Sequence, residues 1–206
     1  MGNENPRKLH LGKKQSAGKA LLETNELIFR PSDGSPRLKI PFSTIKSAQA
    51  VGGELLLETA VGPISFTLGQ TAEKWCQKIL HPKTRAEKLG LKPETQVSLL
   101  GGFDPEFLKE LRAATRNISE DKVNPAGDLI FLSVDSTKQL TTQIAKTTRT
   151  IKGATALWIV YPKGKTEITE NEVISAGRKS GLKDVKVVGF SPTHTALKFV
   201  LPLSSR

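Results

Sequence analysis

The stretch that decides the fold is Ile151–Lys165, "IKGATALWIVYPKGK". Gly153 is placed to end a helix, and a long apolar segment then runs from Ala154 to Tyr161 before it stops at a proline. Such a run, bounded by turn residues, predicts a strand buried on both faces of an open α/β sheet. Two lysines flank a glycine directly after it, at the sheet edge where α/β proteins bind their ligands. The stretch therefore predicts the architecture of the second half of the chain and leaves its chemistry open.

Length and composition describe a globular chain. It has 206 residues, of which 37% are hydrophobic and 25% charged, as in folded domains. No apolar run approaches the roughly 18 residues that span a bilayer, and the N-terminal residues lack the apolar core of a secretory signal. Cys76 is the only cysteine, which excludes an internal disulfide and a multi-cysteine metal site. We expect a soluble cytoplasmic protein without a membrane span or a bound metal.

The chain carries a formal net charge of +11, from 31 Lys and Arg against 20 Asp and Glu. Residues 1–19 hold five basic residues and one acidic residue, and the rest of the excess is spread thinly. A nucleic-acid binder concentrates basic residues on one element and adds aromatic residues for stacking, but only 5% of this chain is aromatic. We therefore predict a flexible basic tail at residues 1–16. Contact of residues 7–19 with nucleic acid or an anionic membrane is kept as a weaker alternative.

Residues 17–82 have the pattern of a β-rich domain closed by one helix. Short apolar segments alternate with turn signals about every 8 to 12 residues, which is typical of a small barrel or sandwich. A helix is predicted from Thr71, its cap, to Leu80. Its apolar residues recur at helical spacing, so we interpret them as core rather than as a reactive site: Ala72, Trp75, Cys76, Ile79 and Leu80.

This layout resembles a pleckstrin-homology-like or GRAM-like barrel. The resemblance is one of architecture, without a diagnostic motif. Barrels of that kind bind peptides or phosphoinositides, and the same fold also serves as a plain interaction module. Residues 83–93, which are polar and basic with prolines near both ends, are expected to form a linker to a second domain.

Residues 94–206 alternate strands with helices, which predicts an α/β domain with a mainly parallel sheet. Strands are predicted at 96–101 and 128–134. Asp104, followed by proline, begins one helix, and the capping box Thr169–Glu172 begins another. Two final strands, separated by the short turn "SPTHT", predict an antiparallel hairpin at the C-terminus.

Three segments of this half carry a family resemblance: "KLGLKPETQVSLLGGFDPEFLKEL", "DLIFLSVDS", and the stretch quoted first together with the residues after it. Asp128 begins the second segment as an aspartate begins the fourth strand of many class I methyltransferases. Over residues 84–202 the segments are similar to a bacterial family of unknown function with a truncated, Rossmann-like methyltransferase fold. The resemblance implies that fold. Since the family has no established activity, it implies no function.

The resemblance to methyltransferases also implies where S-adenosylmethionine would bind, and the chain departs from that pattern. The first strand should end in D/E-x-G-x-G-x-G, because only glycine lets the backbone approach the methionine part of the cofactor closely. The equivalent residues 101–105 hold two glycines, then phenylalanine and a helix cap. The second strand of a methyltransferase should end in an acid that holds the ribose. Here only "RNISEDKVNPAG" lies between the helix that begins at Asp104 and Asp128, which leaves room for one short strand at most. We therefore expect no cofactor.

One candidate site follows from the expected sheet, since the carboxyl ends of parallel strands line a crevice. The sequence has no HExxH, GxSxG, GxGxxG or Walker A motif. Helix N-termini near the strand ends, together with two lysines, favour a small anionic ligand or an acidic peptide of a partner protein. The candidate ligand-binding residues are Gly101, Gly102, Asp104, Asp135, Ser136, Lys163 and Lys165. The competing interpretation makes the aspartates and the serine helix caps, the lysines solvated, and His194 a turn residue.

The expected function is a non-catalytic binding or scaffold protein of the bacterial cytoplasm. The reason is that a module-like first domain is joined to a methyltransferase-like domain without its cofactor loop. No catalytic residue is predicted. The alternative is a divergent enzyme, or a binder of nucleotides or other anionic ligands, that uses the strand-end crevice.

Overall fold

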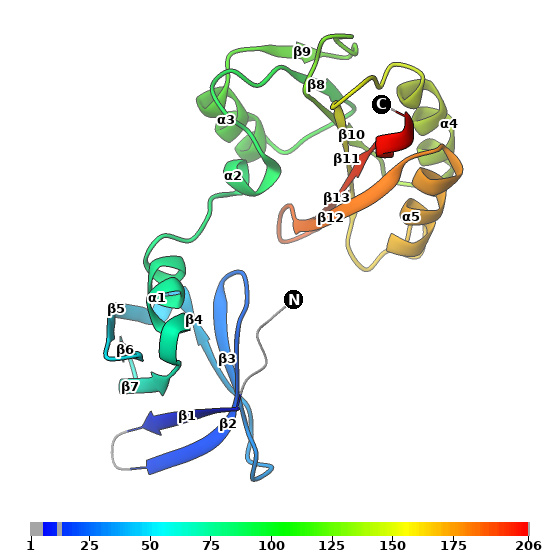
Figure 1. Cartoon of the computed structure of the whole chain (residues 1–206). Coiled ribbons are helices and arrows are strands. Elements are labelled where there is room, and N and C mark those ends of the chain that lie inside the picture. The colour runs from blue at the N-terminus through cyan, green and yellow to red at the C-terminus, as the bar shows by residue number, and fades with distance from the viewer. Residues whose placement is uncertain (1–5, 12–13, 206) are drawn as a thin grey trace. The chain divides into compact units, whose positions relative to one another are not determined.

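The structure is a computed structural model that describes residues 6–11 and 14–205 (Figure 1). The chain divides into two compact units, Met1–Lys83 and Thr84–Arg206, called unit 1 and unit 2 below. Each unit has its own hydrophobic core. Among the described residues, no helix is both long and apolar enough to cross a membrane.

Unit 1 is built on one antiparallel sheet with the strand order β4-β3-β2-β1-β7-β6-β5. Its strands are β1 (Pro6–Leu11), β2 (Lys14–Leu22), β3 (Glu26–Pro31), β4 (Leu38–Pro41), β5 (Ile45–Val51), β6 (Glu54–Thr59) and β7 (Gly62–Thr67). Short 3-10 turns at Phe42–Thr44 and Gly69–Thr71 precede β5 and the helix α1 (Ala72–Leu80). In β6, Leu55 and Leu57 are buried whereas Leu56 is exposed. Such alternation gives the sheet one core face and one outer face.

The helix α1 packs its apolar face on this core, as predicted for Trp75 and Cys76. Burial raises the pKa of the Cys76 thiol, and the carboxylate of Glu73 adds to the shift. A neutral, buried thiol is a packing group rather than a nucleophile. Two details of the predicted helix were wrong: Leu80 is 46% exposed, and the Thr71 hydroxyl donates to the Leu68 carbonyl instead of accepting a helix N–H.

The predicted flexible tail, residues 1–16, was wrong wherever the structure describes it. β1 pairs with β2 on one side and with β7 on the other, so it joins the two halves of the sheet. The physical reason is the alternation around Leu9, which is buried in the core while the basic residue before it is exposed. Residues 1–5 and 12–13 of that segment lie outside the described residues.

The predicted barrel is not confirmed. β4 and β5 are the two edges of the sheet, and no pairing joins them in the part of the chain that the structure describes. The helix α1 lies against β5 and β6 (Figure 1). Unit 1 is therefore an open antiparallel sheet with one helix packed on it.

Unit 2 is an α/β domain with the strand order β12-β13-β11-β10-β8-β9. Its strands are β8 (Val97–Leu100), β9 (Ile118–Glu120), β10 (Leu129–Ser133), β11 (Ala156–Pro162), β12 (Lys183–Gly189) and β13 (His194–Val200). Its helices are α2 (Arg85–Leu89), α3 (Pro105–Ala114), α4 (Thr137–Thr148) and α5 (Glu170–Lys179), with a final 3-10 turn at Leu203–Ser205. The strands β9, β8, β10 and β11 are parallel, and β13 runs antiparallel between β11 and β12. The parallel strands and the final hairpin confirm the predicted α/β domain.

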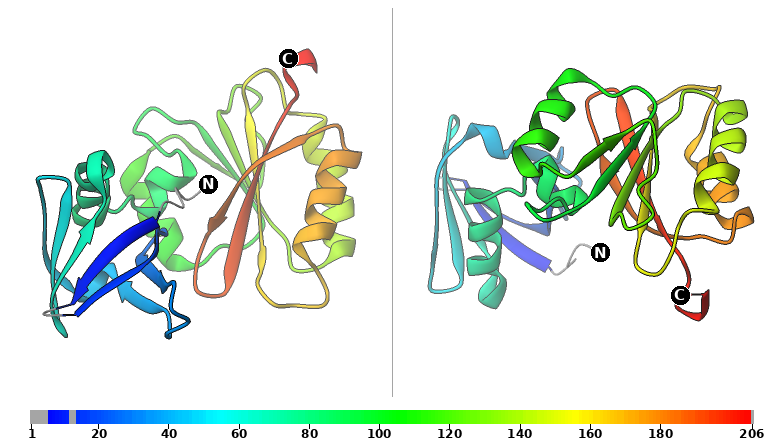
Figure 2. Two further views of the ribbon diagram at one scale, coloured as in Figure 1. Left: turned by 60° about the horizontal axis from the view of Figure 1, so that its bottom comes forward. Right: turned by 90° about the horizontal axis from the view of Figure 1, so that it is seen from above.

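The strand β11 supplies the centre of this sheet, as its apolar run predicted. It pairs with β10 on one side and β13 on the other, and six of its seven residues are buried. Trp158 belongs to the core under α2 and α3, whereas its neighbour Ile159 belongs to the core under α4 and α5 (Figure 2). A strand between two helical layers buries both faces, which explains why its sequence lacks the polar alternation of β6.

The predicted linker, residues 83–93, was wrong because most of it is the start of unit 2. Thr84 and Glu87 form a capping box: the Thr84 hydroxyl accepts from the Glu87 N–H at 3.2 Å, and the Glu87 carboxylate accepts from the Thr84 N–H at 2.7 Å. Leu89 is fully buried, and its carbonyl accepts from the indole N–H of Trp158 at 3.1 Å. The segment is rich in charged residues and has prolines near both ends, so composition alone suggested a linker.

Candidate functional site

The carboxyl ends of the parallel strands in unit 2 border a cavity of about 320 Å³, called the crevice below. Its wall comes from the loop and first turn after β8, the end of β10, β11, and the turn between β12 and β13. Because β13 runs antiparallel to β11, its first residue lies at the same sheet edge as the end of β11. The lining residues are Gly102, Phe103, Asp104, Pro105, Glu106, Ser133, Val160, Phe190, Ser191, Pro192, Thr193 and His194.

Packed aromatic rings support one side of the crevice. Phe103 and Phe190 line it, with ring centres 6.4 Å apart. The ring of Phe107 lies 5.4 Å from Phe103 and 4.6 Å from Phe190. Phe131 of β10 packs on Phe107 at 5.3 Å. Tilted contacts at these distances are favourable and hold the rings in place, so the shape of the crevice depends on this aromatic wall.

Arg85 of α2 positions the aromatic wall. Its guanidinium carbon lies 5.4 Å from the ring centre of Phe107 and 5.2 Å from that of Phe190. Nη1 donates to the Phe190 carbonyl at 3.0 Å, and Nε donates to the Glu110 carboxylate at 2.8 Å. The side chain is only 12% exposed, and its buried Nη2 has no hydrogen-bond partner among the described residues. Arg85 therefore joins α2, α3 and the β12–β13 turn.

Of the predicted site residues, Gly102 and Asp104 line the crevice, and Gly101 lies directly beside it. Gly101 has a φ of 91°, and a Cβ added there would lie 2.8 Å from the Ser133 carbonyl oxygen. Only glycine fits this close approach of the loop to β10. Asp104 caps α3, since its Oδ1 accepts from the Phe107 N–H at 2.7 Å. Its Oδ2 lies 3.7 Å from Nη1 of Arg85.

Asp135 and Ser136 do not line the crevice. The Ser136 hydroxyl caps α4 by accepting from the Gln139 N–H at 3.3 Å. The backbone N–H of Asp135 donates to the side-chain oxygen of Gln139 at 2.8 Å. Both residues thus organise the first turn of α4, although only Ser136 is a helix cap.

The two predicted lysines also lie outside the lining. Lys163 is exposed but not simply solvated, because its Nζ donates to the Ser191 carbonyl at 2.6 Å and its N–H to the Thr193 carbonyl at 2.8 Å. It ties the end of β11 to the β12–β13 turn. Lys165 is exposed beside Glu167, whose pKa is lowered mainly by its own backbone N–H and to a smaller extent by this lysine.

Sequence reasoning missed the wall that the β12–β13 turn contributes. The prediction that His194 is a turn residue was wrong by one position, because it is the first residue of β13 and follows the turn. It lines the crevice, with Nδ1 2.9 Å from the Thr193 hydroxyl. The short hairpin beside β11 was the available signal, since it brings this turn to the carboxyl edge of the sheet. The charged residues of the lining are Asp104 and Glu106, and no lysine or arginine is among the described residues that line the crevice. Two carboxylates oppose the predicted anionic ligand.

The residues around β8 and β9 do not fit S-adenosylmethionine in the manner of methyltransferases. β9 is the one short strand for which the sequence left room, and it ends in an acid, Glu120. That carboxylate pairs with Arg112 at 3.2 Å and does not line the crevice. In the loop after β8, the ring of Phe103 packs into the aromatic wall where the cofactor pattern has glycines. The chain thus has an acid after its second strand but lacks the loop that the cofactor needs.

No family model matches this chain, and no curated protein matches it. Solved structures similar to it include methyltransferases and a pleckstrin-homology domain. Fibrillarin from Aeropyrum pernix, in complex with S-adenosylmethionine, is 16% identical with a TM-score of 0.38, covering 85% of this chain and 94% of that chain. Human N-acetylserotonin methyltransferase is 10% identical with a TM-score of 0.43, covering 63% of this chain and 55% of that chain. The N-terminal pleckstrin-homology domain of human ARAP2 is 12% identical with a TM-score of 0.35, covering 50% of this chain and 90% of that chain.

These likenesses concern the fold alone. Since no family model matches, membership in a bacterial family with a truncated methyltransferase fold stays a prediction.

Proposed function

We propose that this chain is a non-catalytic binding protein whose crevice in unit 2 holds an aromatic side chain of a partner protein. The observation that carries the proposal is that the polar groups predicted to bind a ligand instead hold the fold together around a wall of aromatic rings. One side of the crevice is a wall of packed rings. Predicted ligand-binding groups are committed to the fold: Asp104 caps α3, and Lys163 holds the Ser191 carbonyl. Groups used in this way supply a fixed shape rather than an acid, a base or a nucleophile.

The size and charge of the crevice favour one ring that carries a hydrogen-bond donor. Its volume of about 320 Å³ is at the small end of ligand sites, which measure about 300–1,000 Å³. Phe103 and Phe190 offer ring contacts, and the carboxylate of Glu106 offers an acceptor. Tryptophan combines a large ring with a single N–H donor, so it matches both features.

At the level of domains, we propose that unit 2 is a truncated methyltransferase-like domain and unit 1 a pleckstrin-homology-like module of a bacterial protein. The antiparallel β13 between β11 and β12, and the missing glycine loop, support the first assignment. Seven strands followed by one helix support the second. Both folds host many unrelated functions, so the binding proposal depends on the crevice and not on this assignment.

The test is an NMR titration of the full chain with N-acetyl-tryptophanamide. We expect the shifted backbone amides to cluster in residues 102–106 and 190–194, with none of comparable size in unit 1. S-adenosylmethionine and adenosine nucleotides should shift none of them. Calorimetric binding of S-adenosylmethionine with micromolar affinity would overturn the proposal, as would tryptophanamide shifts scattered over the whole chain.

A matched pair of variants locates the binding. A Cβ added at Gly102 meets nothing within 4 Å, so we expect Gly102→Leu to be tolerated by the fold and to add a side chain at the wall of the crevice. It should weaken tryptophanamide binding at least about tenfold, since it competes for the same small volume. Lys165→Leu introduces the same side chain on an exposed loop outside the crevice and should keep the wild-type affinity. Equal affinities of the two variants would contradict the assignment.

A divergent enzyme or nucleotide binder is the second candidate, because His194 and Ser133 line the same crevice as Asp104. Imidazole, hydroxyl and carboxylate groups are the types of side chain that move protons in active sites. This candidate predicts that a nucleotide or adenosyl compound raises the melting temperature of the wild-type chain and not of His194→Ala. A panel of such compounds that leaves both melting temperatures unchanged rejects it.

A further inference from the structure

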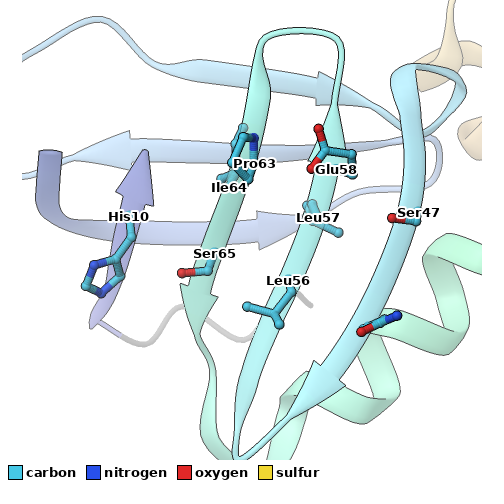
Figure 3. Close-up of a pocket in the computed structure, with 9 residues that line it drawn as sticks. His10, Ser47, Leu56, Leu57, Glu58, Pro63, Ile64 and Ser65 are labelled. Atoms are coloured by element: carbon cyan, nitrogen blue, oxygen red, sulfur yellow. The ribbon is translucent and has the colours of Figure 1, made fainter. Parts of the chain in front are cut away.

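A second hollow lies in unit 1, on the face of the sheet opposite the core (Figure 3). It has a volume of about 360 Å³ and crosses the neighbouring strands β1, β7, β6 and β5. We call it the groove. Its lining residues are His10, Ser47, Gln49, Leu56, Leu57, Glu58, Pro63, Ile64 and Ser65.

The strand register gathers polar side chains into a row across the groove. His10 of β1 faces Ser65 of β7, which in turn faces Leu56 of β6. Leu56 faces Gln49 of β5. Facing residues of antiparallel strands have their Cβ atoms about 5 Å apart, so this row spans four strands as a continuous strip. Its apolar member, Leu56, is 37% exposed and stands between the polar ones (Figure 3).

A second row lies beside the first. Pro63 of β7 faces Glu58 of β6, and Glu58 faces Ser47 of β5. Figure 3 shows the Glu58 carboxylate on the same face of the sheet as the ring of His10 and the hydroxyl of Ser65. The two rows therefore place hydroxyl, amide, imidazole and carboxylate groups beside the apolar side chains of Leu56 and Pro63.

The polar side chains of the groove have no hydrogen-bond or ion-pair partner among the described residues. Five of them form no hydrogen bond or ion pair with another described residue: His10, Ser47, Gln49, Glu58 and Ser65. Glu54 is a useful contrast on the same strand and face, because its carboxylate accepts from the Thr67 hydroxyl at 3.4 Å. Glu58 is the charged member of the five at pH 7, so the groove is a negative site in a chain of net charge +11.

We infer that the groove binds an arginine side chain of a partner protein. All five free groups can accept a hydrogen bond, and the guanidinium of arginine has five N–H donors and no acceptor. Its charge complements Glu58, and its planar fork suits a carboxylate with flanking acceptors. The aliphatic stem can pack on Leu56 and Pro63 while the head stays polar. The inference concerns unit 1 and does not depend on the function proposed for unit 2.

The experiment is an NMR titration of the full chain with acetyl-Gly-Arg-Gly-amide at low salt. We expect amide shifts confined to the four strands of the groove. The peptide with citrulline in place of arginine keeps the shape and loses the charge, so it should not bind measurably. Ethylguanidinium carries the head group alone and should bind more weakly than the peptide, because it lacks the stem and the backbone.

Two exposed carboxylates on β6 provide the matched variants. Glu58→Gln should weaken binding of the arginine peptide about five- to tenfold, as expected for a charge-assisted hydrogen bond at a partly exposed site. Glu54→Gln removes the same charge from the same strand and should leave the affinity unchanged. The inference is overturned if the two variants bind equally, if citrulline binds like arginine, if a lysine peptide binds more tightly, or if ethylguanidinium binds as tightly as the peptide.

Discussion

The two hollows of this molecule use their polar side chains in opposite ways. In the crevice of unit 2, Asp104 caps a helix and Lys163 holds a turn, and the wall is made of packed rings. In the groove of unit 1, five polar side chains have no partner among the described residues. The crevice therefore offers a fixed shape with few free hydrogen-bonding groups, whereas the groove offers free acceptors on an exposed sheet. We therefore expect the crevice to select a ligand mainly by the shape of its ring wall, and the groove to select one mainly by charge and hydrogen bonds.

The largest effect should follow from removing a ring that supports the crevice. Phe107 is fully buried, so Phe107→Ala should lower the free energy of unfolding of unit 2 by about 3–5 kcal/mol, through lost burial and the cavity left behind. Native-state hydrogen exchange on the full chain reports each unit separately, and amides of β10 should lose protection. In the groove, Leu56→Ala should change the free energy of opening measured by hydrogen exchange at the β6 amides by no more than about 1 kcal/mol. Comparable losses at the two sites would contradict the contrast.

Arg85→Met tests whether the charge behind the aromatic wall matters. The substitution keeps an unbranched apolar side chain and removes the hydrogen bonds to the Phe190 carbonyl and the Glu110 carboxylate. Because the guanidinium is largely buried, unit 2 should lose about 2–3 kcal/mol of unfolding free energy. Tryptophanamide should bind more weakly as well, since the Phe190 ring loses its support. Unchanged stability in urea unfolding would show that Arg85 does not position the wall.

The smallest effect concerns pH and the carboxylates committed to unit 2. Two hydrogen bonds from Thr169 to the Glu172 carboxylate lower the pKa of Glu172 below its ordinary value. The larger effect comes from the Thr169 hydroxyl and the smaller one from the Thr169 backbone N–H. A depressed folded-state pKa contributes stability above the ordinary value of about 4.3, and this contribution is lost as pH falls through the folded-state pKa. Glu172→Gln should therefore make the stability of unit 2 less dependent on pH below about 4. An acid-unfolding curve as steep as that of the wild type would contradict this linkage.

Two capping boxes show how far the sequence could be interpreted. Thr169–Glu172 predicted α5 correctly, and the same pattern at Thr84–Glu87 begins α2, but prolines and charge around the second box suggested a linker. The pattern was sufficient in both cases, and composition overrode it in one. Leu9 gave a similar signal within the basic N-terminal segment, because an apolar residue between polar neighbours is typical of a strand with one buried face.

The candidate site was predictable in position but not in composition. The edge of the sheet followed from the parallel strands, and Gly102 and Asp104 do line the crevice. The contribution of the Phe190–His194 turn depends on the place of β13 beside β11, which is a property of the sheet as a whole. The groove depends even more on tertiary structure, because its row joins His10 to Gln49 through three strand pairings. No local sequence pattern contains that information.

The central claim is that the crevice binds an aromatic side chain and not the cofactor of methyltransferases. The most direct test is one pair of NMR titrations on the full chain, with N-acetyl-tryptophanamide and with S-adenosylmethionine. We expect saturable shifts at residues 102–106 and 190–194 with the first compound, weakened in Gly102→Leu, and none with the second. Saturable shifts at those residues with S-adenosylmethionine, and none with tryptophanamide, would contradict it.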